Sequence, residues 1–436
     1  MRPANTLDSI NLGPILKTIS ELRWILRLSP RKRKAKQKQM VDILKGVRVL
    51  SFNHFLMGPV GVQFLADLGA DVIAIEPLEG AFQRKWGGAN KEVDGQSMLL
   101  LTGNRNKRSL ALDLKKPQAV AVAKKLIATS DVIAENFRPG VLDKLGLGYE
   151  DAKKIKPDII FAAASGFGAD GPYVNRPGQD LLIQALSGLA MITGSRIHGP
   201  RAVGVSAIDH HGAALFAAGI LAALVRKERT GQGCRVDVSL LAAALDLQME
   251  SFTCYLNGPR PDDVRQPSPI AGWYYAAPYG IYATRDGYVA ISLGSLDLLW
   301  DTLGVAADRR VPDKEAYLRR DEASATIAAN LAERTTVETL ALLEARGIWH
   351  ARVNDYADVI ADPQVVHNKS FQIVKGATGT PITLVNHPVR YDGMVPEVRL
   401  PPQKLGAQSE EILRELGYDA QQLKDLSDKG AVGIPA

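Results

Sequence analysis

The carboxylate of Asp209 is the first candidate for chemistry in this sequence. Asp209 stands just before a long apolar run, residues 213–225, that predicts a buried helix. In one interpretation it is the N-cap of that helix, because aspartate is a preferred N-cap residue and the helix dipole favours an anion there. In the other it is an ionised, partly desolvated carboxylate that acts as a nucleophile. Of the neighbouring His210 and His211, at most one can face the same site, because adjacent helical residues do not share a face.

Two polar clusters lie near predicted strands. The segment 104–108 is strongly basic, and the segment 135–140 follows an apolar run. Ligands in open α/β sheets bind at strand ends, so either cluster could hold a phosphate or a nucleotide. From the residues alone, a solvated loop is the simpler interpretation of both. The cations of the first cluster are Arg105, Lys107 and Arg108.

The common cofactor signatures are missing or out of place. The sequence has no Walker A, GxSxG or HExxH pattern. A GxGxxG pattern at 166–171 is followed by Pro172 and Pro177, so a loop is predicted there and not the helix of a dinucleotide site. Cys234 and Cys254 have neither zinc-site spacing nor the number needed for a disulfide framework. We therefore expect no metal and no permanently bound cofactor.

Composition places the chain among soluble globular proteins of two or three domains, with 436 residues, 46% of them hydrophobic and 23% charged. The apolar run 213–225 is too short for a transmembrane segment. The net charge is +6, but residues 1–44 alone contain ten Lys and Arg against three Asp and Glu. The remainder is nearly neutral, so no nucleic-acid partner is expected.

Residues 1–44 form a basic N-terminal extension. A solvated extension is the favoured interpretation, and an organelle presequence or a surface-seeking basic helix are the alternatives. We expect a cytoplasmic protein, with a mitochondrial location if the extension is a presequence.

Alternating strands and helices dominate the chain from residue 45 to 256. Short apolar runs separated by helical stretches predict an α/β fold with a parallel sheet covered on both faces. The predicted strands are 47–52, 72–76, 110–114, 132–137, 159–164 and 235–240, with helices at 59–68, 118–128 and 213–225.

The pattern changes after residue 256. Residues 257–270, rich in Pro, Gly and Asp, predict a linker. A small domain follows at 271–375, opening with a hairpin whose strands 279–284 and 288–293 flank a turn. A second linker is predicted at 376–390 and C-terminal helices at 391–436.

A series of motifs, in order, resembles the class III CoA-transferase family (CaiB/BaiF type), which includes formyl-CoA transferases, carnitine CoA-transferases and α-methylacyl-CoA racemases. The match covers about residues 44–430. It includes LADLGADVI at 65–73, NRNKRSLALD at 104–113, ENFRPG at 135–140, LGLGY at 145–149, SGFG at 165–168, RPGQD at 176–180 and DGY at 286–288. The resemblance implies a large Rossmann-like open parallel-sheet domain, a smaller α+β domain, two linkers and an interlocked homodimer. The C-terminal helices would return to the large domain.

The resemblance also implies a chemistry. Asp209 would attack an acyl-CoA thioester, and CoA would pass through aspartyl anhydride and aspartyl-CoA thioester intermediates to a small carboxylic acid, such as the dicarboxylate succinate. Coenzyme A and acyl-CoA would be substrates. Our own addition, from charge alone, is that the cations at 105, 107 and 108 bind the CoA phosphates. The expected CoA-binding residues are Leu56, Met57, Arg105, Lys107, Arg108, Leu112, Lys115, Asn136, Phe137, Arg138, Lys144, Gln179 and Asp180.

Gln179 is the most discriminating position within this resemblance. The family's racemases carry a histidine there, paired with the aspartate at 209, and glutamine cannot act as a general base. A transferase is therefore favoured over an α-methylacyl-CoA racemase or epimerase. Leu56 stands where formyl-CoA transferases have glutamine, which argues for a bulkier acyl group. A non-catalytic CoA-binding protein is the remaining alternative.

Overall fold

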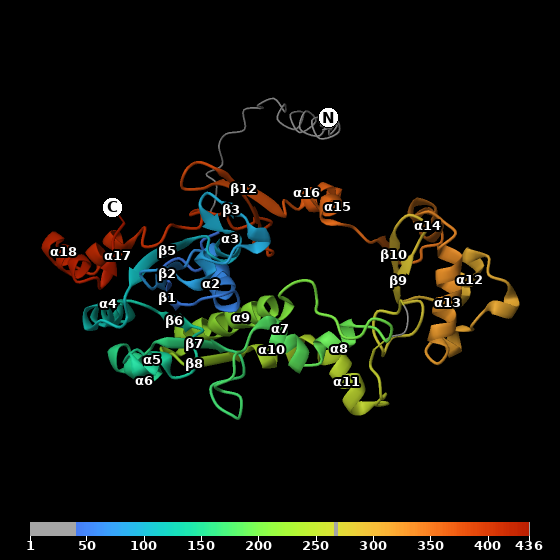
Figure 1. Cartoon of the computed structure of the whole chain (residues 1–436), viewed down its shortest axis with the longest axis horizontal. Helices are drawn as coiled ribbons and strands as arrows, with labels where there is room; N and C mark the ends of the chain where they lie inside the picture. Colours follow the sequence, from blue (N-terminus) through green and yellow to red (C-terminus); the bar gives the residue numbers. More distant parts are fainter. Residues whose placement is uncertain (1–40, 266–268, 436) are drawn as a thin grey trace, which may run out of the picture. The chain divides into compact units, whose positions relative to one another are not determined.

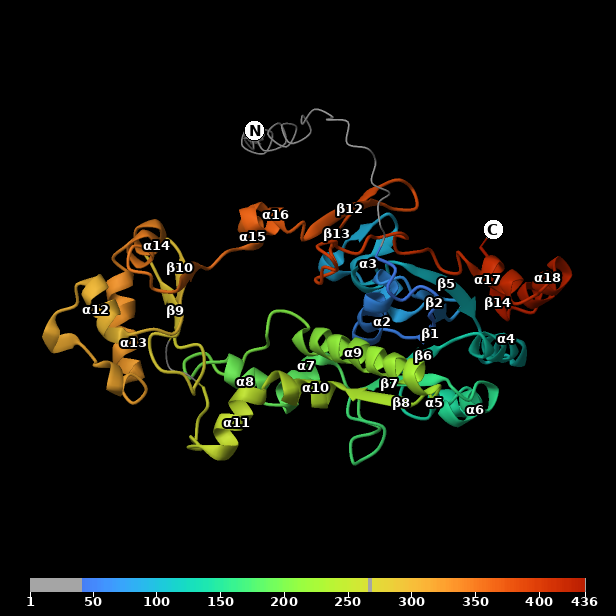
Figure 2. The same ribbon diagram turned by 180° about the vertical axis from the view of Figure 1, so that it is seen from behind.

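The chain is described by a computed structural model that covers residues 41–265 and 269–435. The predictions for the N-terminal extension therefore lie almost wholly outside the described residues. The helices and strands of the described part are shown in Figures 1 and 2.

A seven-stranded sheet forms the centre of the fold, in the order β14-β5-β2-β1-β6-β7-β8. Six strands run parallel, and only β14 is antiparallel to its neighbour. This confirms the predicted α/β class with a mainly parallel sheet. The strands are β1 (Arg48–Phe52), β2 (Asp71–Glu76), β5 (Lys107–Leu112), β6 (Val132–Glu135), β7 (Ile160–Ser165), β8 (Arg235–Ser239) and β14 (Val432–Gly433).

One face of the sheet is covered by α2 (Met57–Asp67) and α9 (Ala207–Thr230), which pack against each other (Figure 1). The two helices come close because residue 61 of α2 is glycine. A Cβ atom on Gly61 would lie 2.9 Å from Cδ1 of Phe216 on α9. By length and hydropathy alone α9 could cross a membrane. In the structure its buried residues, among them Ile208, Phe216 and Ile220, pack in the core, as expected of a central helix.

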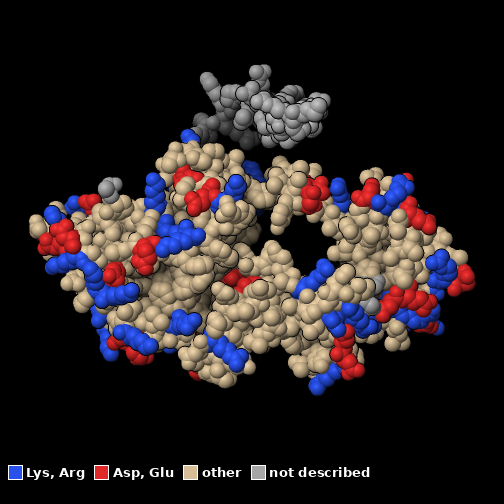
Figure 3. All heavy atoms as spheres, viewed as in Figure 1, with Lys and Arg blue, Asp and Glu red and all other residues tan. Residues whose placement is uncertain are grey.

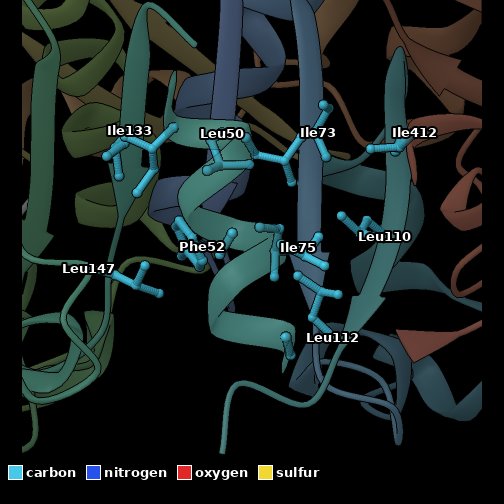
Figure 4. Packing of buried hydrophobic residues seen from close by; sticks show 14 of the residues in the cluster. Leu50, Phe52, Ile73, Ile75, Leu110, Leu112, Ile133, Leu147 and Ile412 are labelled. Atoms are coloured by element: carbon cyan, nitrogen blue, oxygen red, sulfur yellow. The ribbon is translucent and has the colours of Figure 1, made fainter. Parts of the chain in front are cut away.

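The other face is covered by helices from both ends of the described chain. Leu50, Ile73 and Ile133 lie side by side in neighbouring strands, and Ile412 packs into the same cluster (Figure 4). The C-terminal helices thus complete the core, and β14 adds the last strand at the edge beside β5 (Figure 2). The helices that contribute are α4 (Pro117–Ala128), α5 (Val141–Lys144), α6 (Tyr149–Ile155), α17 (Ser409–Glu415) and α18 (Ala420–Asp428).

A separate cluster of buried residues, including Tyr282, Trp300 and Ile327, surrounds a three-stranded antiparallel sheet. The predicted hairpin is present as β9 (Gly280–Ala283) and β10 (Tyr288–Ile291), with β11 (His350–Arg352) beside it. Its helices are α12 (Leu296–Leu303), α13 (Arg320–Leu331) and α14 (Thr336–Glu344). The division into two domains joined by linkers, and the interlocked homodimer, stay predictions.

Several boundaries differ from the predictions: α9 begins six residues before the predicted helix 213–225 and ends five residues after it, α2 begins two residues early, and β6 ends two residues before residue 137. Strand β5 begins at Lys107, three residues before the predicted start, because that cation is buried inside the sheet. The second predicted linker contains β13 (Pro381–Val385), which pairs with β12 (Phe371–Lys375) across a turn at 376–380.

The remaining elements are short. They are β3 (Glu92–Val93), β4 (Gln96–Ser97), α3 (Met98–Gly103), α7 (Asp180–Leu186), α8 (Leu189–Thr193), α10 (Leu240–Leu247), α11 (Met249–Asn257), α15 (Tyr356–Ala361) and α16 (Pro363–His367). Basic and acidic side chains are interspersed over the face drawn in Figure 3.

Candidate active site

A cavity of about 990 Å³ opens at the carboxyl ends of β1, β6 and β7. The N-terminal ends of α2, α7 and α9 also reach it. Strand β1 is the point from which the chain adds strands in both directions, first β2 and later β6. Ligands of open α/β sheets bind at such a switch point, outside the carboxyl ends of the strands.

Asp209 lines this cavity as the third residue of α9, not as its N-cap. The predicted capping role is therefore wrong, because Ser206 occupies the N-cap position. The backbone N–H groups of Ile208 and Asp209 donate instead to the carboxylate of Asp180, at 2.8 and 2.9 Å. Gln184 also donates to Asp180 and so fixes its orientation. Asp180 thus accepts the hydrogen bonds of two backbone N–H groups at the start of α9. The Asp209 carboxylate is not needed as a cap and lines the cavity.

The environment of Asp209 controls its ionisation. Burial and the negative charge of Asp180 raise the pKa of Asp209 to about 7, against a hydrogen bond from the Met57 backbone N–H that lowers it. Met57 is the first residue of α2, so the carboxylate lies at the positive end of that helix dipole. A carboxylate that ionises near neutral pH, with little solvation, is a good nucleophile toward an activated carbonyl.

Glycines bring the start of α2 against Asp209. A Cβ atom on Gly58 would overlap the side chain of Asn53, which donates to Ser51 Oγ at 2.9 Å at the end of β1. A Cβ atom on Gly212, one turn along α9 from the site, would lie 2.9 Å from Cε of Met57. These close approaches place the Met57 N–H beside the carboxylate.

The turn after β6 forms a second wall. The side-chain amide of Asn136 binds the backbone of His54 twice. Oδ1 accepts from the His54 N–H at 2.8 Å, and Nδ2 donates to the His54 carbonyl at 2.7 Å. The rings of Phe137 and His54 stack with centroids 5.3 Å apart. Burial lowers the pKa of His54 to about 4, so its imidazole is neutral at physiological pH. The exposed Arg138 completes this side of the cavity.

The GxGxxG segment is a loop, as predicted, and it supports the third wall. A Cβ atom on Gly166 would lie 2.7 Å from Cα of Gly178, so the two backbones touch where neither residue has a side chain. This contact holds Gln179 and Asp180 at the cavity. Gln179 is the N-cap residue of α7 and offers no group that could move a proton.

Eight predicted site residues come together in the cavity lining: Leu56, Met57, Asn136, Phe137, Arg138, Gln179, Asp180 and Asp209. Leu112, Lys115 and Lys144 do not line it. The side chain of Leu112 is buried in the sheet core, and both lysines are exposed.

The prediction that the cations of segment 104–108 bind phosphate needs correction, because each is already occupied. Arg105 forms a buried ion pair with Asp67, with 2.7 Å between Nη2 and Oδ2. Lys107 donates to two backbone carbonyls, at 2.6 and 2.8 Å, and its burial lowers its pKa to about 7. Arg108 pairs with Asp71 at 2.7 Å and with two glutamates of α17. None of the three lines the cavity.

Sequence reasoning missed the aromatic side of the cavity. The rings of Phe55 and Phe82 lie 4.4 Å apart, and Trp86 lies 5.6 Å beyond Phe82. Arg176 also lines the cavity, resting on the ring of Tyr173. No spacing pattern marks these residues. Among the described residues, no group of three or more His, Cys, Asp or Glu could hold a metal ion.

Comparison with known proteins shows the family of this chain. The sequence model of CoA-transferase family III matches residues 44–409. The chain belongs to this family. A succinyl-CoA:glutarate CoA-transferase of Mus musculus is 34% identical over 399 residues, covering 89% of this chain and 90% of that protein. A succinate–glutarate CoA-transferase of Agrobacterium fabrum is 30% identical over 394 residues, covering 86% and 95%.

Solved structures agree. The crystal structure of a CaiB/BaiF family protein from Brucella suis superposes with a TM-score of 0.76 at 28% identity, covering 87% of this chain and all of that one. The protein is therefore a CoA-transferase of family III, an enzyme whose substrates are CoA thioesters.

Proposed function

We propose that this enzyme transfers CoA from a dicarboxylic acyl-CoA, such as succinyl-CoA, to a free dicarboxylic acid, with Asp209 as the nucleophile. The observation that carries the proposal is the Asp209 carboxylate, held in the cavity at the start of α2 with a pKa near neutrality. The two relatives that act on succinate and glutarate support the dicarboxylate class.

The proposed reaction begins when Oδ of Asp209 attacks the thioester carbonyl carbon of the donor. The C–S bond breaks, CoA leaves as thiolate, and a mixed anhydride remains. The thiolate then attacks Cγ of Asp209, which releases the donor acid as a carboxylate and leaves an aspartyl-CoA thioester. The acceptor carboxylate attacks Cγ, thiolate leaves again, and its attack on the acceptor acyl carbon yields the new acyl-CoA and free Asp209.

The chain's own groups assist each step. The Met57 N–H lies at the Asp209 carboxylate, so it can stabilise negative charge on an oxygen there, and the α2 dipole adds to this effect. The buried apolar side chains of Leu56 and Met57 in the cavity lining limit water near intermediates that water would hydrolyse.

Two guanidinium groups are proposed to hold the anionic parts of the substrates. Arg138 and Arg176 line the cavity, and neither forms an ion pair with a carboxylate of the described chain. One would bind a phosphate of CoA and the other the second carboxylate of the acid. We place the nucleotide along the turn 136–138, where the stacked rings of Phe137 and His54 offer an aromatic surface.

We also propose a homodimer. Helices α7, α8, α10 and α11 expose a group of large apolar side chains that a soluble monomer would rarely leave uncovered. Among them are Leu181, 62% exposed, and Leu256, 60% exposed. A cytoplasmic location stays a prediction.

Intact-protein mass spectrometry under denaturing conditions tests the chemistry. The protein is mixed with succinyl-CoA, glutaryl-CoA and a monocarboxylic acyl-CoA, and Asp209→Asn is the matched control. A CoA-sized adduct on the wild type that the variant lacks is the expected result. Absence of any adduct, together with loss of an α-deuterium from the substrate, would refute the transferase proposal in favour of a racemase.

A further inference from the structure

Glu135 is a buried carboxyl that the reaction does not use. It is the last residue of β6, between Phe52 of β1 and Ala163 of β7, and only 8% of its surface is exposed. It lies in register with Ile133 on the face of the sheet opposite α2 and α9. Its Oε2 accepts a hydrogen bond of 2.7 Å from the backbone N–H of Phe137.

A second, small cavity of about 30 Å³ lies around Glu135. Phe137, Pro139 and Ser165 line both this cavity and the large one. Residues 136–139 therefore separate the two cavities, and Glu135 contacts them from the side of the small cavity. On the other side the same turn presents Asn136, Phe137 and Arg138 to the substrate cavity.

The charged neighbours of Glu135 come from two elements. Arg235 and Asp237 of β8 face it but are bound to each other, with 2.9 Å between Nη2 and Oδ1. Asp143 of α5 contributes a further negative charge. The uncharged phenol of Tyr149 on α6 also lines the small cavity. Within the described chain Glu135 forms no ion pair, so the Phe137 N–H is its closest polar support.

We propose that Glu135 is a positioning residue, whose carboxylate fixes the turn 136–138 and thereby sets the affinity of the cavity for CoA. The inference rests on the proposed placement of CoA along this turn. A carboxylate binds a backbone N–H roughly twice as strongly as a neutral acceptor does. Loss of its charge therefore loosens the turn without removing any residue that touches substrate.

This arrangement makes the turn sensitive to pH. Burial raises the pKa of Glu135 to about 7, against the lowering effects of the Phe137 N–H and Arg235 and with smaller raising effects of Asp143 and Asp237. The carboxylate is mostly ionised at pH 8 and mostly protonated at pH 6. We expect the affinity for CoA to fall roughly 5-fold between these values through this group, the factor expected when a charge-assisted hydrogen bond becomes neutral.

The test compares Glu135→Gln with the wild type and with Glu150→Gln, a matched change at an exposed position of α6. Calorimetry at pH 6, 7 and 8 measures the dissociation constant of free CoA, which has no acyl group for Asp209 to attack. The protonation of CoA itself changes with pH in the same way for all three proteins. A difference between them therefore reports the effect of Glu135. We expect Glu135→Gln to bind roughly 5-fold more weakly than the wild type at pH 8 and equally at pH 6, with Glu150→Gln unchanged.

Hydrogen exchange and steady-state kinetics separate the possible failures. The peptide that contains Phe137 should exchange faster in Glu135→Gln than in the wild type at pH 8, and KM for acyl-CoA should rise while kcat stays nearly constant. Unchanged exchange and unchanged CoA affinity would overturn the inference. Faster exchange with normal CoA affinity would overturn the placement of CoA on this turn, and with it the affinity role, while leaving Asp209 chemistry intact.

Discussion

The substitution Asp180→Asn should move the pH dependence of the reaction. It keeps the shape of the side chain and an oxygen that accepts from the N–H groups at the start of α9, but it removes a negative charge. That charge is one of the two causes that raise the pKa of Asp209 to about 7. The variant should therefore ionise its nucleophile at lower pH than the wild type does.

The size of the effect follows from the ionised fraction of Asp209. With a pKa of about 7, one tenth of the wild-type molecules carry the carboxylate at pH 6. Removing the neighbouring charge should lower the pKa by about 1, the lower end of what a nearby charge does to a carboxyl. About half of the variant molecules would then be ionised at pH 6. Through Asp209 alone, the ratio of kcat/KM at pH 6 to that at pH 8 should rise from about 0.1 to about 0.5, a 5-fold difference between the two proteins to which Glu135, common to both, does not contribute.

The assay is initial-rate CoA transfer over pH 5.5–9, with each protein normalised to its own rate at pH 8. Normalisation removes the loss of rate that weaker support of α9 will cause. Asp246→Asn is the matched control, because Asp246 lies on the neighbouring helix α10, pairs with His211 of α9 and does not line the cavity. An unchanged acid limb in Asp180→Asn, or an equal shift in the control, would refute the assignment of charge repulsion between Asp180 and Asp209.

Three further predictions concern stability, each measured by urea unfolding. Arg105→Ala should lower the free energy of unfolding by about 3 kcal/mol, because the buried Asp67 loses its arginine partner and keeps its contacts with Asn106 and His387; a loss below about 1 kcal/mol would contradict the importance of the buried pair. Gly61→Val should cost about 3 kcal/mol by forcing α2 away from Phe216, whereas Gly61→Ala should cost less. Asp209→Asn should be more stable than the wild type by about 1–3 kcal/mol at pH 8, and the difference should shrink as the pH falls below 7 and vanish only near the unfolded pKa of 3.8, because a carboxyl with a raised pKa destabilises the folded state wherever the unfolded carboxyl is ionised.

The strands were predictable because burial on both faces leaves a strong signal. The runs that became β1 and β6 are mostly apolar and almost wholly buried, a pattern that a parallel sheet covered on both faces makes favourable. The apolar pattern predicts the start of β5 three residues late, because the strand begins with Lys107, Arg108 and Ser109. An apolar pattern reveals only the burial of apolar residues. Lys107 is buried through hydrogen bonds to backbone carbonyl groups, so the pattern does not detect it.

The site residues that belong to sequence motifs were predictable. Those whose role depends on a partner far away in the sequence were not. Asp209 and the turn 136–138 lie in family motifs, and they meet in the cavity. The occupied state of Arg105 and Arg108 is invisible in the sequence, because their partners lie from 37 to 307 residues away. For the same reason, the capping of α9 by Asp180, 29 residues earlier in the chain, could not be foreseen.

The pairing of β14 with β5 has a consequence for biosynthesis. The pairing of Val432 with Leu112 joins β14 to a strand synthesised more than 300 residues earlier. Until residues 409–433 have left the ribosome, the outer edge of β5 has no partner and the cluster around Leu110 lacks α17 and α18. The nascent protein therefore completes its main sheet only after residue 433 has emerged. Throughout that interval a strand edge remains open to aggregation, and a chaperone that shields it would be of most use then.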